Sequence, residues 1–282
     1  MPFATHVELL IYLFITLAML CIGMSASVAD MVALLRERQR ALRALIANVL
    51  VPPVVALGLI WLFPIGDAAA TVLLLLAFAP GGINAVQFST KSPGQLPAAG
   101  GLLILLSVIG LVTAPVAAKW LLPSDATITI PLGYLMFRIF VLVGAPLAIG
   151  MIVRALAPGV AERLYKPAMI VSTLAFIASV VLSLDLRQDA AGALGAPTLL
   201  ALLLFILILM ATGWLLGGPE PGYRQVLAVT TNLRNVGLVY VLIDDCCAEP
   251  RYVTAVLAFM AIMVPANLVL TVVCGILRKR QA

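Results

Sequence analysis

Residues 225–243 read QVLAVTTNLRNVGLVYVLI, an apolar run that is interrupted by the polar stretch Thr230-Thr231-Asn232-Leu233-Arg234-Asn235. A run of this length crosses a bilayer as a helix, because about 20 apolar residues suffice. A charged arginine at the bilayer centre costs at least ~2.5–3.5 kcal/mol, so we expect Arg234 to face a cavity or a partner rather than lipid. The stretch predicts an all-α polytopic membrane protein with a broken helix at this point.

A second apolar run, 68–90, is interrupted by Phe78-Ala79-Pro80-Gly81-Gly82-Ile83-Asn84-Ala85. Proline has no N–H to donate and glycine is a poor helix former, so the helix is expected to break near the middle of the run. Unwound backbone inside a bilayer survives only where it lines a cavity or packs against protein. The new helix ends are then expected to direct their dipoles inward, where they attract ions.

Composition extends this interpretation to the whole chain. The 282 residues are 63% hydrophobic and 10% charged, and their mean hydropathy is +1.18. A soluble domain cannot bury so much apolar surface, whereas a chain surrounded by lipid does not need to. We expect a single transmembrane domain over residues 1–282 with about nine spans, at 8–29, 41–63, 68–90, 97–121, 129–153, 166–185, 195–216, 225–243 and 253–277.

The basic residues predict the orientation, because cytoplasmic loops carry an excess of lysine and arginine. With the N-terminus outside, three basic residues lie outside, namely Lys119, Arg187 and Arg251. The inside segments then hold twelve, namely Arg36, Arg38, Arg40, Arg43, Lys91, Arg154, Arg163, Lys166, Arg224, Arg278, Lys279 and Arg280. We therefore expect a multi-pass protein of the inner (plasma) membrane with a cytoplasmic C-terminus. The net charge of +5 belongs to these loops and does not indicate nucleic-acid binding.

The two interrupted runs have matched surroundings. Asn84 and Arg234 are 150 residues apart (234 − 84), and each precedes by 31 residues a proline of the next span, Pro115 or Pro265. Four spans separate the third from the eighth, so the two broken helices run in opposite directions. The pattern predicts an inverted repeat with halves at about 8–121 and 129–277, an arrangement in which transporters place their site at the midplane.

The charge on Arg234 has no acidic neighbour within the spans, because the 12 acidic residues all fall in loops or at span ends. A guanidinium fits carboxylate or phosphate oxygens in a bidentate manner, so an anionic ligand is one expectation. The alternative is that Arg234 donates to carbonyls of the broken third span and locks the crossing. Both roles can coexist.

Other polar residues near the breaks are candidate substrate ligands by position. These are Asn84, Thr230, Thr231, Asn232 and Asn235, with Asn48 before Pro53 and Asn267 after Pro265. The alternative for each is a hydrogen bond between helices, worth about 0.6 kcal/mol. The cluster from Thr230 to Asn235 favours a site, whereas an isolated asparagine favours the structural alternative.

Several function classes lack the residues that they require. The four cysteines have no metal-ligand spacing, His6 is the only histidine, and no nucleotide-binding loop or Ser/His/Asp arrangement is present. We expect no metal, no cofactor and no enzymatic activity.

Three stretches of the chain resemble the bile acid:sodium symporter superfamily. They are Gly23-Met24 with Asp30 and the basic loop 36–43, Ala79-Pro80-Gly81-Gly82 with Gly94, and Arg234-Asn235-Val236-Gly237-Leu238 with Pro265-Ala266-Asn267. The resemblance implies a fold of two inverted five-helix repeats, divided into a panel and a core domain. On this resemblance we expect the family's first helix to be absent from this chain, which would leave nine helices and an N-terminus outside.

The resemblance also identifies departures at the sodium ligands of the sodium-coupled relatives. The family's oxygen ligands fall at Ala85, Val86, Ala99 and Leu103, its essential glutamate at Thr230, and the glutamine of its Gln-Asn pair at Arg234. Sodium prefers oxygen ligands, so most of its site is absent. Arg234 would then supply, in fixed form, the positive charge that sodium brings.

These observations predict a secondary transporter that moves a small organic anion, a carboxylate, across the bilayer by alternating access. Sodium coupling is doubtful, and a proton or no ion remains open as the coupling partner. Two alternatives stay open: an arsenite- or auxin-type efflux carrier of the same fold, and a membrane sensor or scaffold that transports nothing.

Overall fold

The computed structural model describes residues 2–25, 27–82, 96–121, 132–186, 194–246 and 250–279. Most of these residues form helices, and each predicted span is helical over most of its described part, with breaks after Phe78 and Asn232. In chain order the helices are α1 (Pro2–Ser25), α2 (Val28–Arg36), α3 (Arg38–Leu45), η1 (Ile46–Leu50), α4 (Val51–Leu62), α5 (Asp67–Phe78), α7 (Leu96–Leu121), α8 (Leu132–Ile139), η2 (Phe140–Gly144), α9 (Ala145–Leu156), α10 (Pro158–Leu186), α12 (Gly195–Leu216), α13 (Pro221–Asn232), α14 (Val236–Cys246) and α15 (Pro250–Lys279).

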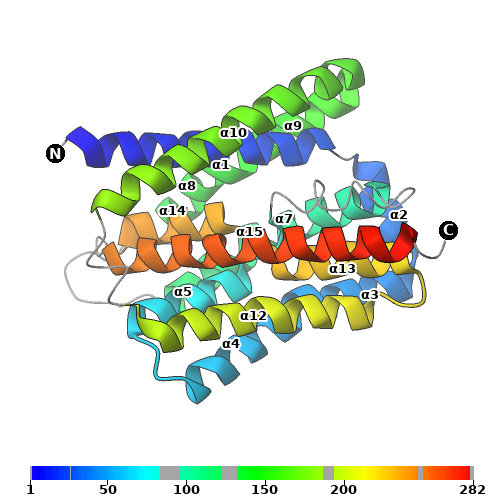
Figure 1. The fold of residues 1–282 in the computed structure, drawn as a ribbon. Coiled ribbons are helices and arrows are strands. Elements are labelled where there is room, and N and C mark those ends of the chain that lie inside the picture. Colours follow the sequence, from blue (N-terminus) through cyan, green and yellow to red (C-terminus); the bar gives the residue numbers. More distant parts are fainter. Residues whose placement is uncertain are drawn as a thin grey trace.

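The helices pack in two layers (Figure 1). Helix α1 packs against α9, α10 and the π-helical turn η2, and with α8 these form the layer that we call the α1 layer. In the second layer α12 packs against α13, α15 and α4, while α5 packs against α4, α7 and α15. This second layer contains both broken helices, and we call it the crossing layer.

The exterior of the bundle is apolar. Large hydrophobic side chains such as Leu9, Val54 and Leu156 are exposed, and Trp61 and Trp120 are 87% and 80% exposed near the ends of their helices. Six helices in the described parts of the chain are long and apolar enough to cross a membrane, and α5 is a shorter apolar helix. Exposed apolar helices are stable only in lipid, so the chain is a multi-pass membrane protein.

Both interrupted runs break where the sequence predicts. Pro80 cannot donate an N–H to the carbonyl of Leu76, four residues earlier, and α5 ends at Phe78. Gly81 has φ +94°, a conformation that residues other than glycine rarely adopt. In the other run α13 ends at Asn232, Leu233 is extended, and α14 begins at Val236.

The two breaks lie against each other and pair in an antiparallel manner. The N–H of Gly82 donates to the carbonyl of Leu233 at 2.9 Å, and the N–H of Asn235 donates to the carbonyl of Ala79 at 2.8 Å. A Cβ on Gly82 would lie 2.7 Å from the backbone of Leu233, so only glycine permits this approach. The unwound segments thus satisfy part of their own hydrogen bonding at the crossing.

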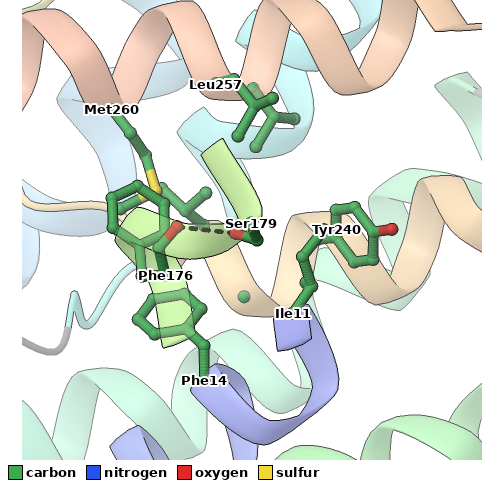
Figure 2. Close-up of a pocket in the computed structure, with 10 residues that line it drawn as sticks. Ile11, Phe14, Phe176, Ser179, Tyr240, Leu257 and Met260 are labelled. Carbon is green, nitrogen blue, oxygen red and sulfur yellow. Dashed lines mark hydrogen bonds between the residues drawn. The ribbon is translucent and has the colours of Figure 1, made fainter. Parts of the chain in front are cut away.

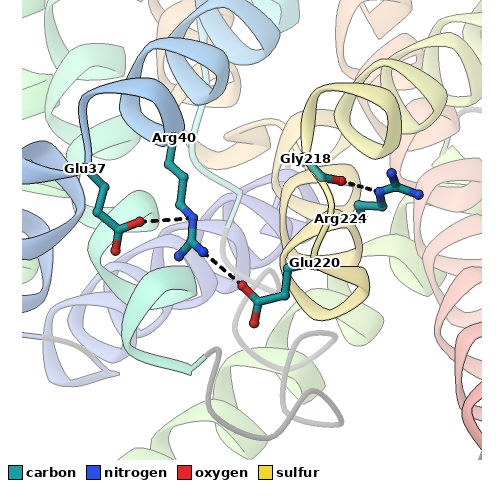
Figure 3. Close-up of polar contacts among 5 residues, drawn as sticks. All are labelled: Glu37, Arg40, Gly218, Glu220 and Arg224. Carbon is teal, nitrogen blue, oxygen red and sulfur yellow. Dashed lines mark hydrogen bonds and ion pairs between the residues drawn. The ribbon is translucent and has the colours of Figure 1, made fainter.

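Ion pairs join two turns at the end of the bundle that carries the C-terminus (Figures 1 and 3). Arg40 contacts Glu37 and Glu220, at 3.0 Å each, and its guanidinium lies 5.2 Å from the ring centre of Tyr223. Nearby, Arg224 donates to the carbonyl of Gly218. These contacts connect the α2–α3 turn to the α12–α13 turn. The free ends of α1 and α15 lie at opposite ends of the bundle (Figure 1).

Helix α1 contacts α9 at two glycines. A Cβ on Gly150 would lie 2.2 Å from the carbonyl oxygen of Leu20, and a Cβ on Gly23 would lie 2.2 Å from that of Leu147. Here the two backbones touch, as is common where membrane helices pack through small residues.

We predict that Gly150→Val lowers the free energy of unfolding by about 3 kcal/mol or more, because the added atoms overlap backbone that cannot move aside. The measurement is the thermal unfolding midpoint of the purified protein in detergent. Gly58→Val is the matched control, since a Cβ there meets nothing within 4 Å. Equal midpoints for the two variants would contradict the proposed backbone contact.

Candidate functional site

Arg234 lies at the crossing and is 1% exposed. Its Nε donates to the carbonyl of Leu76 at 2.8 Å, and Nη2 donates to the carbonyl of Ala77 at 2.6 Å. Nη1 donates to the carbonyl of Thr231 at 3.3 Å, and both Nη atoms lie 3.2 Å from the carbonyl of Asn48. A guanidinium has five N–H donors, so every one of them has a backbone acceptor here.

These carbonyls are available because the helices break beside them. Asn48 precedes Pro52 by four residues and Pro53 by five, and neither proline has the N–H that would donate to its carbonyl in an α- or π-helical turn. Thr231 loses its helical donor because the N–H of Asn235 bonds to Ala79 instead. One arginine side chain therefore collects acceptors from η1, α5 and α13. The carbonyl of Leu76 also accepts from the N–H of Ala79, whereas those of Asn48 and Thr231 have lost their helical donors.

No carboxylate pairs with this guanidinium among the residues that the structure describes. The ion pairs found there involve Arg40 and Arg154, both near the ends of helices. Carbonyl oxygens are dipoles and do not cancel a full charge, so a net positive charge remains inside the crossing layer. Arg234 thus donates to backbone carbonyls at the break, which is the structural role considered above. Its charge is not neutralised by these contacts and stays available to attract an anion.

Asn232 and Asn267 lie together at the crossing. Their side-chain amides exchange two hydrogen bonds, Asn232 Nδ2 to Asn267 Oδ1 at 3.1 Å and Asn267 Nδ2 to Asn232 Oδ1 at 2.6 Å. Each amide also donates to a carbonyl one turn earlier in its own helix, that of Ala228 or Met263. The pair connects α13 to α15, and its geometry is that of a bond between helices.

The threonines of the break donate back to a carbonyl of their own helix. Both Thr230 Oγ1 and Thr231 Oγ1 donate to the carbonyl of Leu227, at 3.2 Å and 2.6 Å. Asn48 Nδ2 donates to the carbonyl of Ala44 at 2.9 Å and to Thr231 Oγ1 at 3.4 Å. Asn48 Oδ1 is buried and has no hydrogen-bond partner, which makes it the one unsatisfied side-chain atom of the predicted site within the described residues.

Asn235 caps α14 at the crossing. Its Oδ1 accepts from the N–H of Leu238 at 3.0 Å, and its Nδ2 lies 4.0 Å from the sulfur of Met19 on α1. Such a cap orients the positive end of the α14 dipole toward the crossing. Asn84, the remaining candidate, lies outside the described residues.

Two adjoining, narrow hollows lie between the two layers. The first, which we call the Arg234 hollow, reaches the crossing; its lining is Phe14, Gly82, Leu233, Arg234, Val236, Met260 and Met263. The second, the Tyr240 hollow, is drawn in Figure 2; its lining is Ile11, Phe14, Phe176, Ser179, Val236, Gly237, Tyr240, Val256, Leu257 and Met260. The two share three residues, so they mark one crevice between α1 and α10 on one side and α14 and α15 on the other.

A seam between α1 and α14 runs beside this crevice. The rings of Tyr12 and Tyr240 meet edge to face with their centres 6.5 Å apart, and a Cβ on Gly237 would lie 2.9 Å from Ile15. Met19 lies beside Asn235, so the contacts advance along α1 as the residue numbers fall along α14, as expected for antiparallel helices. Arg138 of α8 also reaches this seam and donates to the hydroxyl of Tyr12 at 2.7 Å.

Sequence reasoning did not identify the apolar lining of the crevice. Phe14, Phe176 and Met260 look like any lipid-facing residue in an apolar span, and only packing distinguishes them. The role of Pro52 could have been predicted from the sequence, because a proline four residues after Asn48 frees the carbonyl of Asn48 in any α-helix.

We predict that Arg234→Ala lowers the free energy of unfolding by about 3–5 kcal/mol, because it leaves several buried carbonyls without donors. Arg234→Lys keeps the charge but has three donors on one atom, so it should recover only part of the loss. Chemical unfolding in detergent measures both. Arg224→Ala is the control, since that arginine has a single carbonyl contact at a turn. If Arg234→Ala is no less stable than Arg224→Ala, the carbonyl contacts of Arg234 contribute nothing.

The amide pair can be tested with a double-mutant cycle. Asn232→Leu or Asn267→Leu alone leaves the partner amide unpaired, whereas the double variant removes both polar groups. We expect the two single losses to sum to about 1 kcal/mol more than the loss of the double variant. The unfolding midpoints of the four proteins give the coupling, and additive losses would show that the amides act independently.

Comparison with known proteins agrees with this geometry. The profile of the sodium bile acid symporter family matches residues 12–191, more than half of the chain. That range includes the break at Pro80 and ends before α13, so it does not include Arg234. A search of curated proteins finds no match. The resemblance noted in the sequence is therefore confirmed, and the chain belongs to the sodium bile acid symporter family, whose members are membrane transporters.

Proposed function

We propose that this chain is a secondary transporter that moves a small organic anion, a carboxylate, through the crevice between its two layers. The observation that carries the proposal is the buried positive charge of Arg234 at the crossing, in contact with a hollow and without a described carboxylate beside it. An anion that enters the hollow meets this charge and the positive end of α14. No enzymatic chemistry is needed for this activity.

The site proposed for the anion combines residues with different roles. Arg234 acts through its charge, since its N–H groups are engaged with carbonyls. Asn235 caps the α14 terminus, and Asn48 supports the crossing by donating to the carbonyl of Ala44 and to Thr231. Thr230, Thr231, Asn232, Asn267 and Asn84 complete the predicted set; the first four support the crossing through contacts between or within helices.

The topology proposed for transport is nine spans related by an inverted repeat, with the N-terminus outside and the C-terminus in the cytoplasm. The opposite positions of the helix ends in Figure 1 support an odd number of crossings. Trp61 and Trp120 lie near the ends of α4 and α7, which is consistent with span ends there, because exposed tryptophans favour the membrane interface. In this topology the charge bias places the free end of α1 outside and the free end of α15 in the cytoplasm.

Alternating access would move the α1 layer, as the panel, against the crossing layer, as the core. The hollows are narrow, so a solute can enter only if the layers separate. The seam of Tyr12, Ile15 and Met19 against α14 is the contact that must then open or slide. Its edge-to-face and van der Waals contacts are individually weak, which favours motion between rigid layers.

We also propose that transport does not depend on sodium. Ala99 and Leu103, which stand at positions of sodium ligands in coupled relatives, are buried and have no side-chain oxygen. The carbonyls that face the crossing are already bound by Arg234. A cation there would meet a fixed positive charge in place of ligands.

The test is uptake of radiolabelled monocarboxylates into proteoliposomes, with sodium present or replaced by choline. We expect uptake of at least one such anion, equal in the two media and saturable. Met263→Trp, which fills the Arg234 hollow, should abolish uptake, whereas Val269→Trp on the exposed face of the same helix should not. Uptake that rises saturably with sodium would refute the sodium-independence. The absence of any anion flux would favour a sensor or scaffold.

A further inference from the structure

The crevice has two chemically different ends. At the crossing its lining includes Arg234, which carries the buried positive charge, and Val236 at the start of α14. Away from the crossing its walls are Phe14, Phe176 and Leu257, with few polar groups among them (Figure 2). A solute that spans both hollows is therefore offered a positive field at one end and an apolar surface along the rest.

The polar atoms in the walls have little capacity to bind a polar solute. The hydroxyl of Ser179 donates to the carbonyl of Phe176 at 2.7 Å, and the five N–H groups of Arg234 are all directed at carbonyls. A hydroxyl or a second carboxylate on the solute would lose water in the Tyr240 hollow and find few partners in exchange. Apolar carbon, in contrast, gains by leaving water.

We infer that the transported solute is a monocarboxylate with a short apolar body, aliphatic or aromatic, bound with its carboxylate toward Arg234 and its body between Phe14 and Phe176. This inference rests on the proposed function and narrows its substrate class. It excludes dicarboxylates and polyhydroxylated acids, which a site built from amide and hydroxyl donors would prefer.

Each methylene added to the solute should strengthen binding. Burying one CH₂ contributes about 0.8 kcal/mol, which corresponds to roughly a fourfold change in affinity. From butanoate to hexanoate the concentration that half-inhibits uptake should therefore fall about 16-fold. Phenylacetate should inhibit at least as well as hexanoate, because its ring can pack against two phenylalanines.

The experiment is competition against anion uptake in proteoliposomes. The competitors are butanoate, hexanoate, phenylacetate, succinate, gluconate and the neutral amide phenylacetamide. We expect the first three to inhibit in rising order and the last three to be at least tenfold weaker than hexanoate. Phe176→Ala should reduce the inhibition by phenylacetate about tenfold and that by butanoate little. Ile177→Ala, on the exposed side of α10, is the control and should change neither.

The outcomes separate this inference from the proposed function. If succinate or gluconate inhibits better than hexanoate, the apolar-body inference is overturned while anion transport stands. If phenylacetamide matches phenylacetate, the charge requirement fails and the proposed function with it. If no carboxylate is taken up, both fail. Should Phe176→Ala not fold, Leu257→Ala removes apolar wall from the opposite layer and provides the same comparison.

Discussion

The structure depends on how backbone carbonyls are satisfied where two helices stop inside the bilayer. Each unpaired group there costs several kcal/mol, because hydrocarbon offers no donor. The crossing solves this in two ways: the extended segments pair with each other through Gly82 and Asn235, and the guanidinium of Arg234 takes the carbonyls that remain. Without that side chain, the carbonyls at the breaks would need other donors, either the N–H groups of a continuous helix or water molecules.

The same solution places a positive charge at the crossing. A residue chosen for its five donors also carries a positive charge, and the amides and threonines around it contribute no negative charge. The cavity that reaches Arg234 opens between two layers that touch mainly through small and apolar side chains, such as Ile15 against Gly237. Under the proposed function, the crossing and the α1 layer would be the two parts that move against each other in an alternating-access carrier.

Much of this could be predicted from the sequence, for identifiable physical reasons. The length and polarity of apolar runs predict membrane helices, and the structure has helix over most of the described part of each run. Pro80 and the Thr230–Asn235 stretch predict where helices break, because one lacks an N–H and the other is too polar for lipid. The contact between Asn232 and Asn267, in contrast, is seen only in the structure.

What the sequence could not provide was the distinction between supporting and lining residues. Arginine at mid-membrane is compatible with ligand binding and with carbonyl capture, and only the contacts of Leu76, Ala77 and Asn48 reveal the second role. The walls of the crevice could not be predicted either, because Phe14 and Phe176 differ from lipid-facing residues only in where they lie. Periodicity has no signal for that location in a helix that is apolar on all sides.

The freed carbonyl of Asn48 ties together residues that are far apart in the chain. Because Pro52 and Pro53 remove its helical donors and Arg234 replaces them, neither side of this arrangement is useful without the other. In a descendant lineage, loss of the arginine would favour recovery of a backbone donor at the prolines. The proline pair and the arginine should therefore be inherited as a unit, although 181 positions (234 − 53) separate them.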